Sequence, residues 1–258
     1  MQVAMTDLRR ELQFGISVTP LAERAEAVLE LATLADVLGL GLVTSQDHPY
    51  QARFLDAWTL LSVVATRTAN VHVAPNVANL PLRPPAVLAR SVASLDILSG
   101  GRVELGLGAG AFWDGVAAMG GRRLTPGQSV DALSEAVDVI RQLWSQESGA
   151  VRFEGEQFRV VGAHRGPPPL HPVEIWLGAY KPRMLALTGT KADGWLPSLG
   201  YADPGDLAAM GARIDEAAER AGRRPADIRR MYNINGEFGS GAGFLQASPR
   251  SGPSSSPR

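Results

Sequence analysis

The chain of 258 residues contains no cysteine. This excludes disulfide bonds, thiolate metal sites, cysteine-held iron–sulfur clusters and cysteine nucleophiles. The formal net charge is -1, so the charge balance predicts neither a nucleic acid nor an anionic membrane as partner. No apolar run reaches membrane-spanning length, and the charged segment 1–12 lacks the apolar core of a signal peptide. We therefore expect a soluble, cytoplasmic protein.

What the chain does contain is enough apolar sequence for a large core. Hydrophobic residues make up 45% of its length. A chain of this size and apolar content is typical of one α/β barrel or of two small domains.

The most informative stretch is 96–110. A helix that begins at about Pro85 is predicted to end at Gly100, because glycine enters the left-handed C-cap conformation without a Cβ penalty. Alternating apolar residues at 103–107 then predict a strand, which ends in the glycine-rich turn 106–110. The bare backbone N–H groups of such a turn suit an anionic ligand, although a tight turn that binds nothing has the same sequence.

Strand and helix patterns alternate seven times along the chain, which is typical of parallel βαβ units. We expect Thr19 and Asp56 to cap the first two helices. Strands are predicted at 14–18, 41–45, 71–74, 103–107, 174–177, 194–196 and 230–233, and helices at 20–38, 57–67, 85–98, 130–144, 181–191 and 207–221.

The positions of polar residues favour a closed barrel over an open doubly wound sheet. Functional-looking residues follow four different strands, whereas an open sheet gathers them at one switch point. They are Ser17, Asp47 with His48, Asn76, and the turn 108–110.

Three regions are expected along the chain: an N-terminal extension at 1–13, a barrel at 14–237 and a tail at 238–258. A hairpin around 151–161 predicts an insertion at 146–172. The tail is rich in Gly, Ser and Pro, a composition that favours disorder. We expect an α/β barrel of the TIM (β/α)8 type whose last β/α unit is missing or incomplete.

Several segments together resemble the luciferase-like monooxygenase superfamily, whose members are flavin-dependent or deazaflavin (F420)-dependent oxidoreductases. The resemblance spans about 14–246 and rests on Gln-Asp-His at 46–48, on 56–61 and 80–98, on Ser-Gly-Gly-Arg-Val-Glu-Leu-Gly-Leu-Gly-Ala-Gly at 99–110, and on Ala-Asp-Gly-Trp at 192–195. It implies a TIM barrel with the ring of FMN or F420 in its mouth, acting on a small organic substrate.

The resemblance also implies roles for individual residues. His48 would transfer the proton that accompanies hydride transfer, since a neutral imidazole titrates near physiological pH. Asp47 would fix the tautomer of His48 or hold its loop. A non-prolyl cis peptide bond is expected between Asn76 and Val77. The predicted cofactor-binding residues are Ser17, Asn76, Val77, Gly108, Ala109, Gly110, Gly178, Ala179 and Ser198.

Four charged residues complete these expectations. Lys181 and Arg183 could add positive charge near the cofactor phosphate, although cations that open a surface helix are commonly solvated. Arg102 and Asp96 are expected to pair with each other beneath the barrel.

The sequence departs from the family pattern in two ways. Sugar-phosphate dehydrogenases of the F420 group place a tryptophan and a glutamate where this chain has Ala52 and Ala111, so that activity is not expected. Relatives also continue beyond a segment like 239–246 into a helix and a closing strand. A truncated or frame-shifted member of the family is the resulting hypothesis.

Other functions stay open. The sequence does not separate oxygen activation by reduced FMN from hydride exchange with F420, and a catalytically inactive barrel is the alternative. A metal-dependent hydrolase using His48, His72, His164 and His171 is disfavoured, because no pair has the spacing of a ligand motif, and no metal is expected. A flavin or F420 reductase and a second copy of the chain are the expected protein partners.

Overall fold

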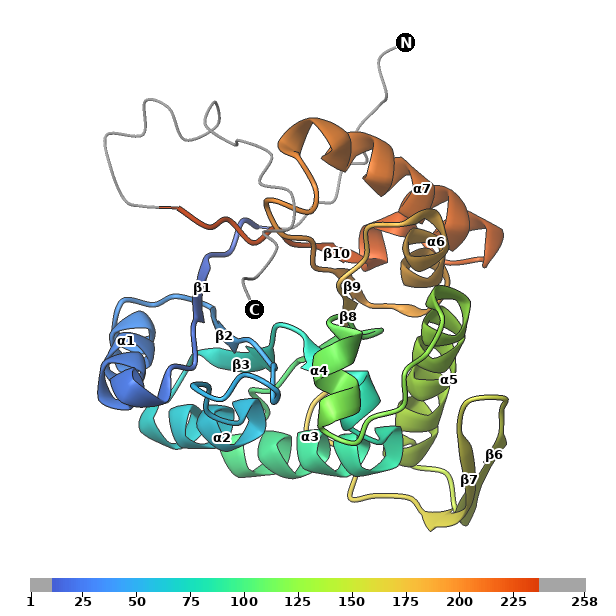
Figure 1. Ribbon diagram of the computed structural model, residues 1–258, viewed down its shortest axis with the longest axis horizontal. Coiled ribbons are helices and arrows are strands. Elements are labelled where there is room, and N and C mark those ends of the chain that lie inside the picture. The colour runs from blue at the N-terminus through green and yellow to red at the C-terminus, as the bar shows by residue number, and fades with distance from the viewer. Residues whose placement is uncertain (1–10, 237–258) are drawn as a thin grey trace.

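The computed structural model describes residues 11–236, which have an α/β barrel fold (Figure 1). Its parallel strands form the wall of the barrel. Two hydrogen-bonded sheets have the orders β1-β2-β3 and β4-β5-β8-β9-β10, and a parallel bridge from Val73 to Val103 joins them. The strands are β1 (Gly15–Val18), β2 (Leu42–Ser45), β3 (His72–Pro75), β4 (Ala78–Asn79), β5 (Leu105–Gly108), β8 (Ile175–Leu177), β9 (Gly194–Trp195) and β10 (Arg229–Arg230).

The strands follow one another in chain order, as a barrel requires. Because β4 continues β3 after a two-residue interruption, the wall has seven parallel positions in the order of the sequence. This order confirms the barrel class over the doubly wound sheet, whose strand order reverses at a switch point.

Helices cover the outside of this wall. Figure 1 shows them following one another around the strands in chain order. They are α1 (Ala25–Val37), α2 (Ala57–Arg67), α3 (Pro85–Ser99), α4 (Trp113–Ala118), α5 (Pro126–Trp144), α6 (Pro182–Lys191) and α7 (Leu207–Arg220), with 3-10 turns at Ala22–Arg24, Leu80–Leu82, Pro204–Asp206 and Pro225–Asp227.

Local signals set most of the helix ends. Asp56 accepts a hydrogen bond from the Thr59 N–H at 2.9 Å and so caps α2, as predicted. Gly100 ends α3 with a φ of 74°, the left-handed conformation that its sequence predicted. Thr125 and Gln128 form a capping box at the start of α5.

The predicted start of the first helix at Thr19 and Pro20 is wrong. The Pro20 carbonyl accepts the Leu55 N–H at 2.7 Å, and Leu21 forms an antiparallel bridge with Phe54. These contacts hold the chain extended beyond the proline, so that α1 begins only at Ala25.

The core lies between the strands and the helices. Leu105, Leu107, Ile175 and Leu177 on adjacent strands have no solvent exposure. On α5, the predicted apolar stripe is confirmed: Leu133, Val137 and Ile140 are fully buried, while Val130 and Trp144 pack partly against the same core.

The predicted insertion is an antiparallel hairpin of β6 (Ala150–Glu154) and β7 (Arg159–His164), which lies beside α5 in Figure 1. Glu135 of α5 fixes its turn, since the carboxylate accepts the N–H groups of Glu156, Gln157 and Phe158 at 2.8–2.9 Å. One carboxylate therefore satisfies three backbone donors of the hairpin turn.

At the two ends of the wall, β1 pairs with β2 and β10 pairs with β9, and no pairing joins β1 to β10 within residues 11–236. The Arg229 side chain reaches Gln13 at 3.0 Å across this opening. The predictions for 1–10 and 237–258, including the tail and the eighth unit, lie outside the described residues. Within 11–236, no helix is both long and apolar enough to cross a membrane.

Candidate functional site

The carboxyl ends of the strands, here called the mouth, carry a bridge of two asparagine side chains. Asn76 follows β3 and donates from Nδ2 to Asn233 Oδ1 at 2.9 Å, and Asn233 donates back to Asn76 Oδ1 at 3.2 Å. Asn233 Nδ2 also lies 3.0 Å from Ser198 Oγ, and Asn76 Nδ2 lies 3.4 Å from Thr44 Oγ1. This asparagine bridge joins strand ends 157 residues apart in sequence.

Asn233 is a site residue that the sequence did not single out. It follows the two-residue strand β10, and its backbone pairs in parallel with Ser198. A weak strand with no flanking motif gives no sequence signal for a residue at the mouth.

The peptide bond between Asn76 and Val77 is cis, as the family resemblance predicted. Glycines of β5 lie directly against this bulge. A Cβ on Gly106 would stand 2.2 Å from the Pro75 carbonyl oxygen, and a Cβ on Gly108 would stand 2.6 Å from Val77 Cγ2. Close backbone packing therefore requires these glycines, whether or not an anion binds to the turn.

His48 lies in a group of aromatic rings, here called the aromatic cluster. Its ring centroid is 5.5 Å from that of Tyr50, 6.3 Å from Phe54 and 5.8 Å from Phe112. Burial lowers the pKa of His48 below its ordinary value, and the nearby charge of Asp47 only partly opposes this effect. No group in 11–236 forms a hydrogen bond with the imidazole, which leaves both ring nitrogens available to a ligand, and burial favours the neutral form of the ring.

Tyrosines supply further neutral donors at the mouth. Burial, with smaller contributions from Asp47 and Tyr201, raises the pKa of Tyr50 to about 12. Burial also raises the pKa of Tyr180, whose hydroxyl accepts the Ser198 N–H at 3.2 Å, and its ring lies 5.4 Å from that of Tyr201. Both phenols therefore stay protonated at neutral pH.

Asp47 holds the loop after β2 and does not contact the His48 ring. The carboxylate is 1% exposed and accepts the Asn79 N–H at 2.9 Å and two hydrogen bonds from Arg83 at 2.6 Å. Within 11–236 no hydrogen bond joins Asp47 to the His48 ring, and Arg83 and Asn79 bind both carboxylate oxygens. These contacts favour the prediction that Asp47 holds the loop over the prediction that it fixes the tautomer of His48.

Arg83 connects Asp47 to the cap of α2, since its Nη2 also lies 2.6 Å from Asp56. Burial alone would raise the pKa of Asp56, but hydrogen bonds from Arg83 and Thr59 outweigh it and lower that pKa. The same two carboxylates outweigh burial and raise the pKa of Arg83. The motif at 80–98 contains Arg83, but its partners Asp47 and Asp56 lie 36 and 27 residues away, so no local pattern predicts these pairs.

The remaining predicted cofactor-binding residues are two glycines, two alanines and one serine. Gly178 lies near the bulge, because an added Cβ would be 3.7 Å from Val77. Gly110 has a φ of 100° and lies against Pro81, which is 2.5 Å from the position of an added Cβ. Ala109 packs partly against the main core, Ala179 is fully buried beside Trp195, and Ser17 is exposed on β1 opposite Thr44.

The expected charges are arranged differently from the prediction. Arg183 pairs with Asp131 at 2.8 Å on the surface. Arg102 and Asp96 do not pair: Arg102 donates to the carbonyl oxygens of Ser99, Val71, Ala65 and Thr68, and Asp96 accepts backbone N–H groups. Arg102 lies at the carboxyl ends of two helices, where unpaired carbonyls attract a cation.

The four histidines do not form one metal site. His48 follows the end of β2, whereas His72 begins β3 in register with Leu42 at the start of β2. His164 ends the exposed hairpin strand β7. His72 and His171 do meet, at the opposite end of the barrel from His48, with ring centroids 5.8 Å apart.

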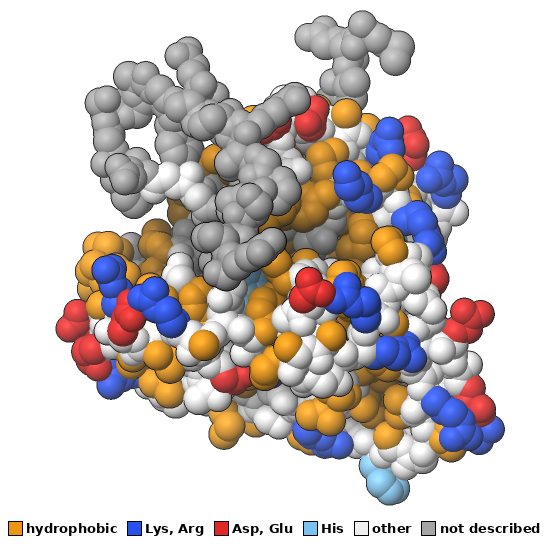
Figure 2. All heavy atoms as spheres, viewed as in Figure 1, with side chains coloured by type: hydrophobic (Ala, Val, Ile, Leu, Met, Phe, Trp, Pro, Cys, Tyr) orange, Lys and Arg blue, Asp and Glu red, His pale blue; other side chains and the backbone are white. Residues whose placement is uncertain are grey.

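The space-filling view shows how charge is distributed on the face seen in Figure 1. In Figure 2, Lys, Arg, Asp and Glu side chains lie along the edge that carries α6, α7 and the hairpin and also along the opposite edge over α1, with more apolar and uncharged surface between these edges.

Comparisons with known proteins agree with this architecture. The model of the luciferase-like monooxygenase family matches residues 9–235. The chain is 31% identical over 215 residues to the F420-dependent glucose-6-phosphate dehydrogenase of Kribbella flavida, covering 80% of this chain and 63% of that protein. It is 31% identical over 214 residues to the 5,10-methylenetetrahydromethanopterin reductase of Archaeoglobus fulgidus, covering 82% and 60%. The chain thus spans about three fifths of the length of these relatives.

Solved structures of the same kind superpose on the chain. An F420-dependent secondary alcohol dehydrogenase in complex with an F420–acetone adduct matches with a TM-score of 0.79 and 25% identity, over 86% of this chain and 68% of that one. The monooxygenase RslO1 from Streptomyces bottropensis matches with a TM-score of 0.73 and 26% identity, over 86% and 71%. The family match and these superpositions lead to one conclusion: the chain belongs to the luciferase-like monooxygenase family and has its TIM-type barrel.

Proposed function

We propose that the protein is an oxidoreductase that binds F420 or FMN at the mouth and acts on a small organic substrate. The observation that carries the proposal is His48: a half-buried, neutral imidazole without a hydrogen-bond partner in 11–236, at the same end of the barrel as the cis bulge. F420 is the first cofactor to test, because two relatives at 31% identity and the superposed alcohol dehydrogenase are named for F420 or for pterin reduction. FMN with oxygen is the second, as in monooxygenases of the family.

The side chains at the mouth fit the ring of either cofactor. Both rings are planar, with carbonyl and N–H groups along their edges, and they require flat apolar walls and neutral donors. The aromatic cluster supplies such walls, and Ser198, Asn76 and Asn233 supply uncharged polar groups. Arg83 pairs with Asp47 and offsets its negative charge, so Asp47 would not repel an anionic cofactor.

When bound, reduced F420 supplies a hydride and oxidised F420 accepts one. The neutral His48 imidazole would take the proton of a substrate hydroxyl as its carbon is oxidised, or return it in the reverse direction. Tyr50 keeps its proton at neutral pH, with a pKa raised to about 12, and would orient the same oxygen as a hydrogen-bond donor. Asp47 and Arg83 would keep His48 in place by holding the loop after β2.

The walls of the mouth favour a small, weakly polar alcohol or carbonyl compound over a sugar phosphate. Ala52 and Ala111 stand where F420-dependent sugar-phosphate dehydrogenases carry larger or charged side chains. Arg183 pairs with Asp131 on the surface, which partly neutralises its charge. Phe112 and Tyr201 instead present aromatic surface.

A reductase that regenerates the cofactor and a second copy of the chain are proposed as protein partners. A cytoplasmic location is proposed with them. Family membership supports the reductase, since a reaction that consumes reduced cofactor needs another enzyme to supply it.

The test is a fluorescence titration of the purified protein with F420 and, separately, with FMN, followed by turnover assays on a panel of short alcohols and ketones. We expect saturable binding of one cofactor and turnover that His48→Ala removes while binding persists. His164→Ala, on the exposed hairpin, is the matched control and is expected to retain turnover. Failure to bind either cofactor would instead support the catalytically inactive barrel.

A further inference from the structure

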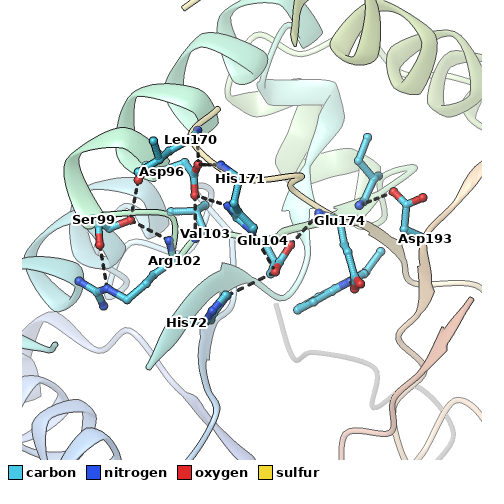
Figure 3. Close-up of polar contacts among 12 residues, drawn as sticks. His72, Asp96, Ser99, Arg102, Val103, Glu104, Leu170, His171, Glu174 and Asp193 are labelled. Carbon is cyan, nitrogen blue, oxygen red and sulfur yellow. Dashed lines mark hydrogen bonds and ion pairs between the residues drawn. The ribbon is translucent and has the colours of Figure 1, made fainter. Parts of the chain in front are cut away.

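A second polar cluster lies at the amino ends of the strands, here called the base. His72 begins β3, Glu104 directly precedes β5, and His171 precedes β8. One nitrogen of each histidine and one oxygen of Glu104 lie within 4.8 Å of one another. Figure 3 shows Glu104 between the two imidazole rings, with His72 and His171 both directed toward it.

Buried partners fix the orientation of His171. Its Nδ1 lies 2.8 Å from Asp96 Oδ1, and Asp96 is fully buried. Asp96 also accepts the Leu170 N–H at 2.7 Å and the Val103 N–H at 3.2 Å, so the carboxylate acts as an acceptor throughout. His171 therefore donates from Nδ1 to Asp96 and directs Nε2 at Glu104 (Figure 3). Carboxylates orient metal-binding histidines in the same manner.

Glu104 is held in the same way. The Glu174 N–H donates to its Oε2 at 2.7 Å, which leaves Oε1 facing both imidazoles. Oε1 lies 3.3 Å from His72 Nδ1 and 3.4 Å from His171 Nε2. With His171 protonated on Nδ1, two electron-rich atoms, Nε2 and Oε1, face each other and require a cation or an added proton between them.

The separations favour a metal ion. They are longer than the 2.7–3.2 Å range of good N–H···O hydrogen bonds. A tetrahedral ion with bonds of about 2.0–2.1 Å places its ligand atoms roughly 3.3 Å apart, close to the two nitrogen–oxygen distances found here. Two imidazoles and one carboxylate suit Zn²⁺ or a neighbouring transition metal, whereas Mg²⁺ and Ca²⁺ prefer ligand sets made of oxygen.

We propose that His72, Glu104 and His171 form a site for a divalent transition metal of the Zn²⁺ class at the base of the barrel. The His72 side chain is 39% exposed, so an ion can enter from solvent and keep a water as its fourth ligand. The ion would tie β3 and β5 to the segment that leaves the hairpin insertion. Because residues at the amino ends of barrel strands serve stability in this fold, the site is structural and separate from the cofactor reaction.

The experiment begins with the full-length protein stripped by a chelator and dialysed into metal-free buffer. It is then titrated with Zn²⁺ by calorimetry and with Co²⁺ by visible absorption. We expect one equivalent to bind, an intense tetrahedral Co²⁺ spectrum, and a melting temperature that rises with Zn²⁺ concentration. His72→Ala and His171→Ala should abolish stoichiometric binding and the rise in melting temperature.

Two controls keep the result decisive. His164→Ala and His48→Ala remove histidines that lie outside the cluster and should bind metal as the unsubstituted protein does. His72→Gln, at the more exposed ligand, guards against a variant that fails to fold. The proposal is overturned if the unsubstituted protein takes up no metal, which is the result expected if a doubly protonated His171 bridges Asp96 and Glu104. It is also overturned if the His72 and His171 variants bind metal as the unsubstituted protein does.

Discussion

The mouth and the base of this barrel use histidine in opposite ways. At the mouth, His48 has aromatic neighbours and no hydrogen-bond partner in the described part of the chain, and burial lowers its pKa. At the base, His171 is bound to a buried carboxylate and faces a second one. An imidazole without partners is available to substrate or cofactor, whereas one fixed between carboxylates is arranged to hold a cation or a proton.

The largest expected effect is on turnover at the mouth. His48→Ala should lower kcat with F420 and the best alcohol by about 10²–10⁴-fold, the usual contribution of a general acid or base. His72→Ala, at the base, should leave kcat within about twofold when assays are run well below its melting temperature. Steady-state kinetics on both variants measure the difference. Equal losses in the two would erase the functional distinction between the ends.

The buried carboxylates at the two ends allow the next comparison. Asp47→Ala leaves Arg83 with Asp56 as its remaining ionic partner within 11–236, and breaking a buried ion pair costs about 3–5 kcal/mol. Asp96→Ala should destabilise the fold by a similar amount, because it strands the N–H groups of Leu170 and Val103. Urea unfolding gives both free energies.

Turnover then separates the two carboxylates. Folded Asp47→Ala should lose activity through the loop that carries His48, and folded Asp96→Ala should keep it. The role of Asp47 in positioning the loop would be refuted by a variant whose kcat and KM match the unsubstituted enzyme at a temperature where both are folded.

Glycine packing provides a smaller effect on stability. Gly106→Ala would force a Cβ to within 2.2 Å of the Pro75 carbonyl oxygen, and overpacking of this kind costs about 1–3 kcal/mol. Gly211→Ala is the matched control: it lies within α7 with nothing within 4 Å of an added Cβ, and it should stabilise the protein by about 0.5–1 kcal/mol. Melting temperatures that move in the same direction would contradict the packing account of β5.

The smallest expected effect is on the pH profile. Burial lowers the pKa of His48 in the folded protein, so folding favours its neutral form, and this site destabilises the fold only as the pH falls below the ordinary value near 6.5. The acid limb of kcat/KM for alcohol oxidation should accordingly lie below about pH 6.5. An acid limb above that pH would argue against a desolvated His48 as the base.

Sequence patterns predicted most of the fold: helices such as 130–144 bury one face at helical spacing, and short apolar runs such as 174–177 form strands that are buried on both faces. The start of α1 was wrong because Leu21 pairs with Phe54, a contact that no local pattern contains. Segments of known family motifs predicted the cis bond at Asn76 and the position of His48. They did not predict the partner of Asp47, which depends on a loop packing 36 residues away.

The polar clusters show more clearly that sequence patterns do not predict contacts between distant residues. The asparagine bridge joins residues 157 apart, and His171 meets Asp96 across 75 residues. Spacing along the chain identifies ligand sets on one helix or one loop, but parallel strands assemble sites from residues that are distant in sequence. The metal interpretation was disfavoured on spacing, and only the tertiary fold showed that two of the four histidines meet.

The central claim is that the cofactor ring lies beside His48 at the mouth. Because the chain contains four histidines, a ¹⁵N-edited spectrum of its imidazole rings is simple enough to assign with single His→Ala variants. On saturation with F420, or with FMN if that cofactor binds, the His48 resonances should shift while those of His72 and His171 stay in place. Shifts confined to the histidines of the base, or cofactor binding that leaves His48 unchanged, would contradict the account.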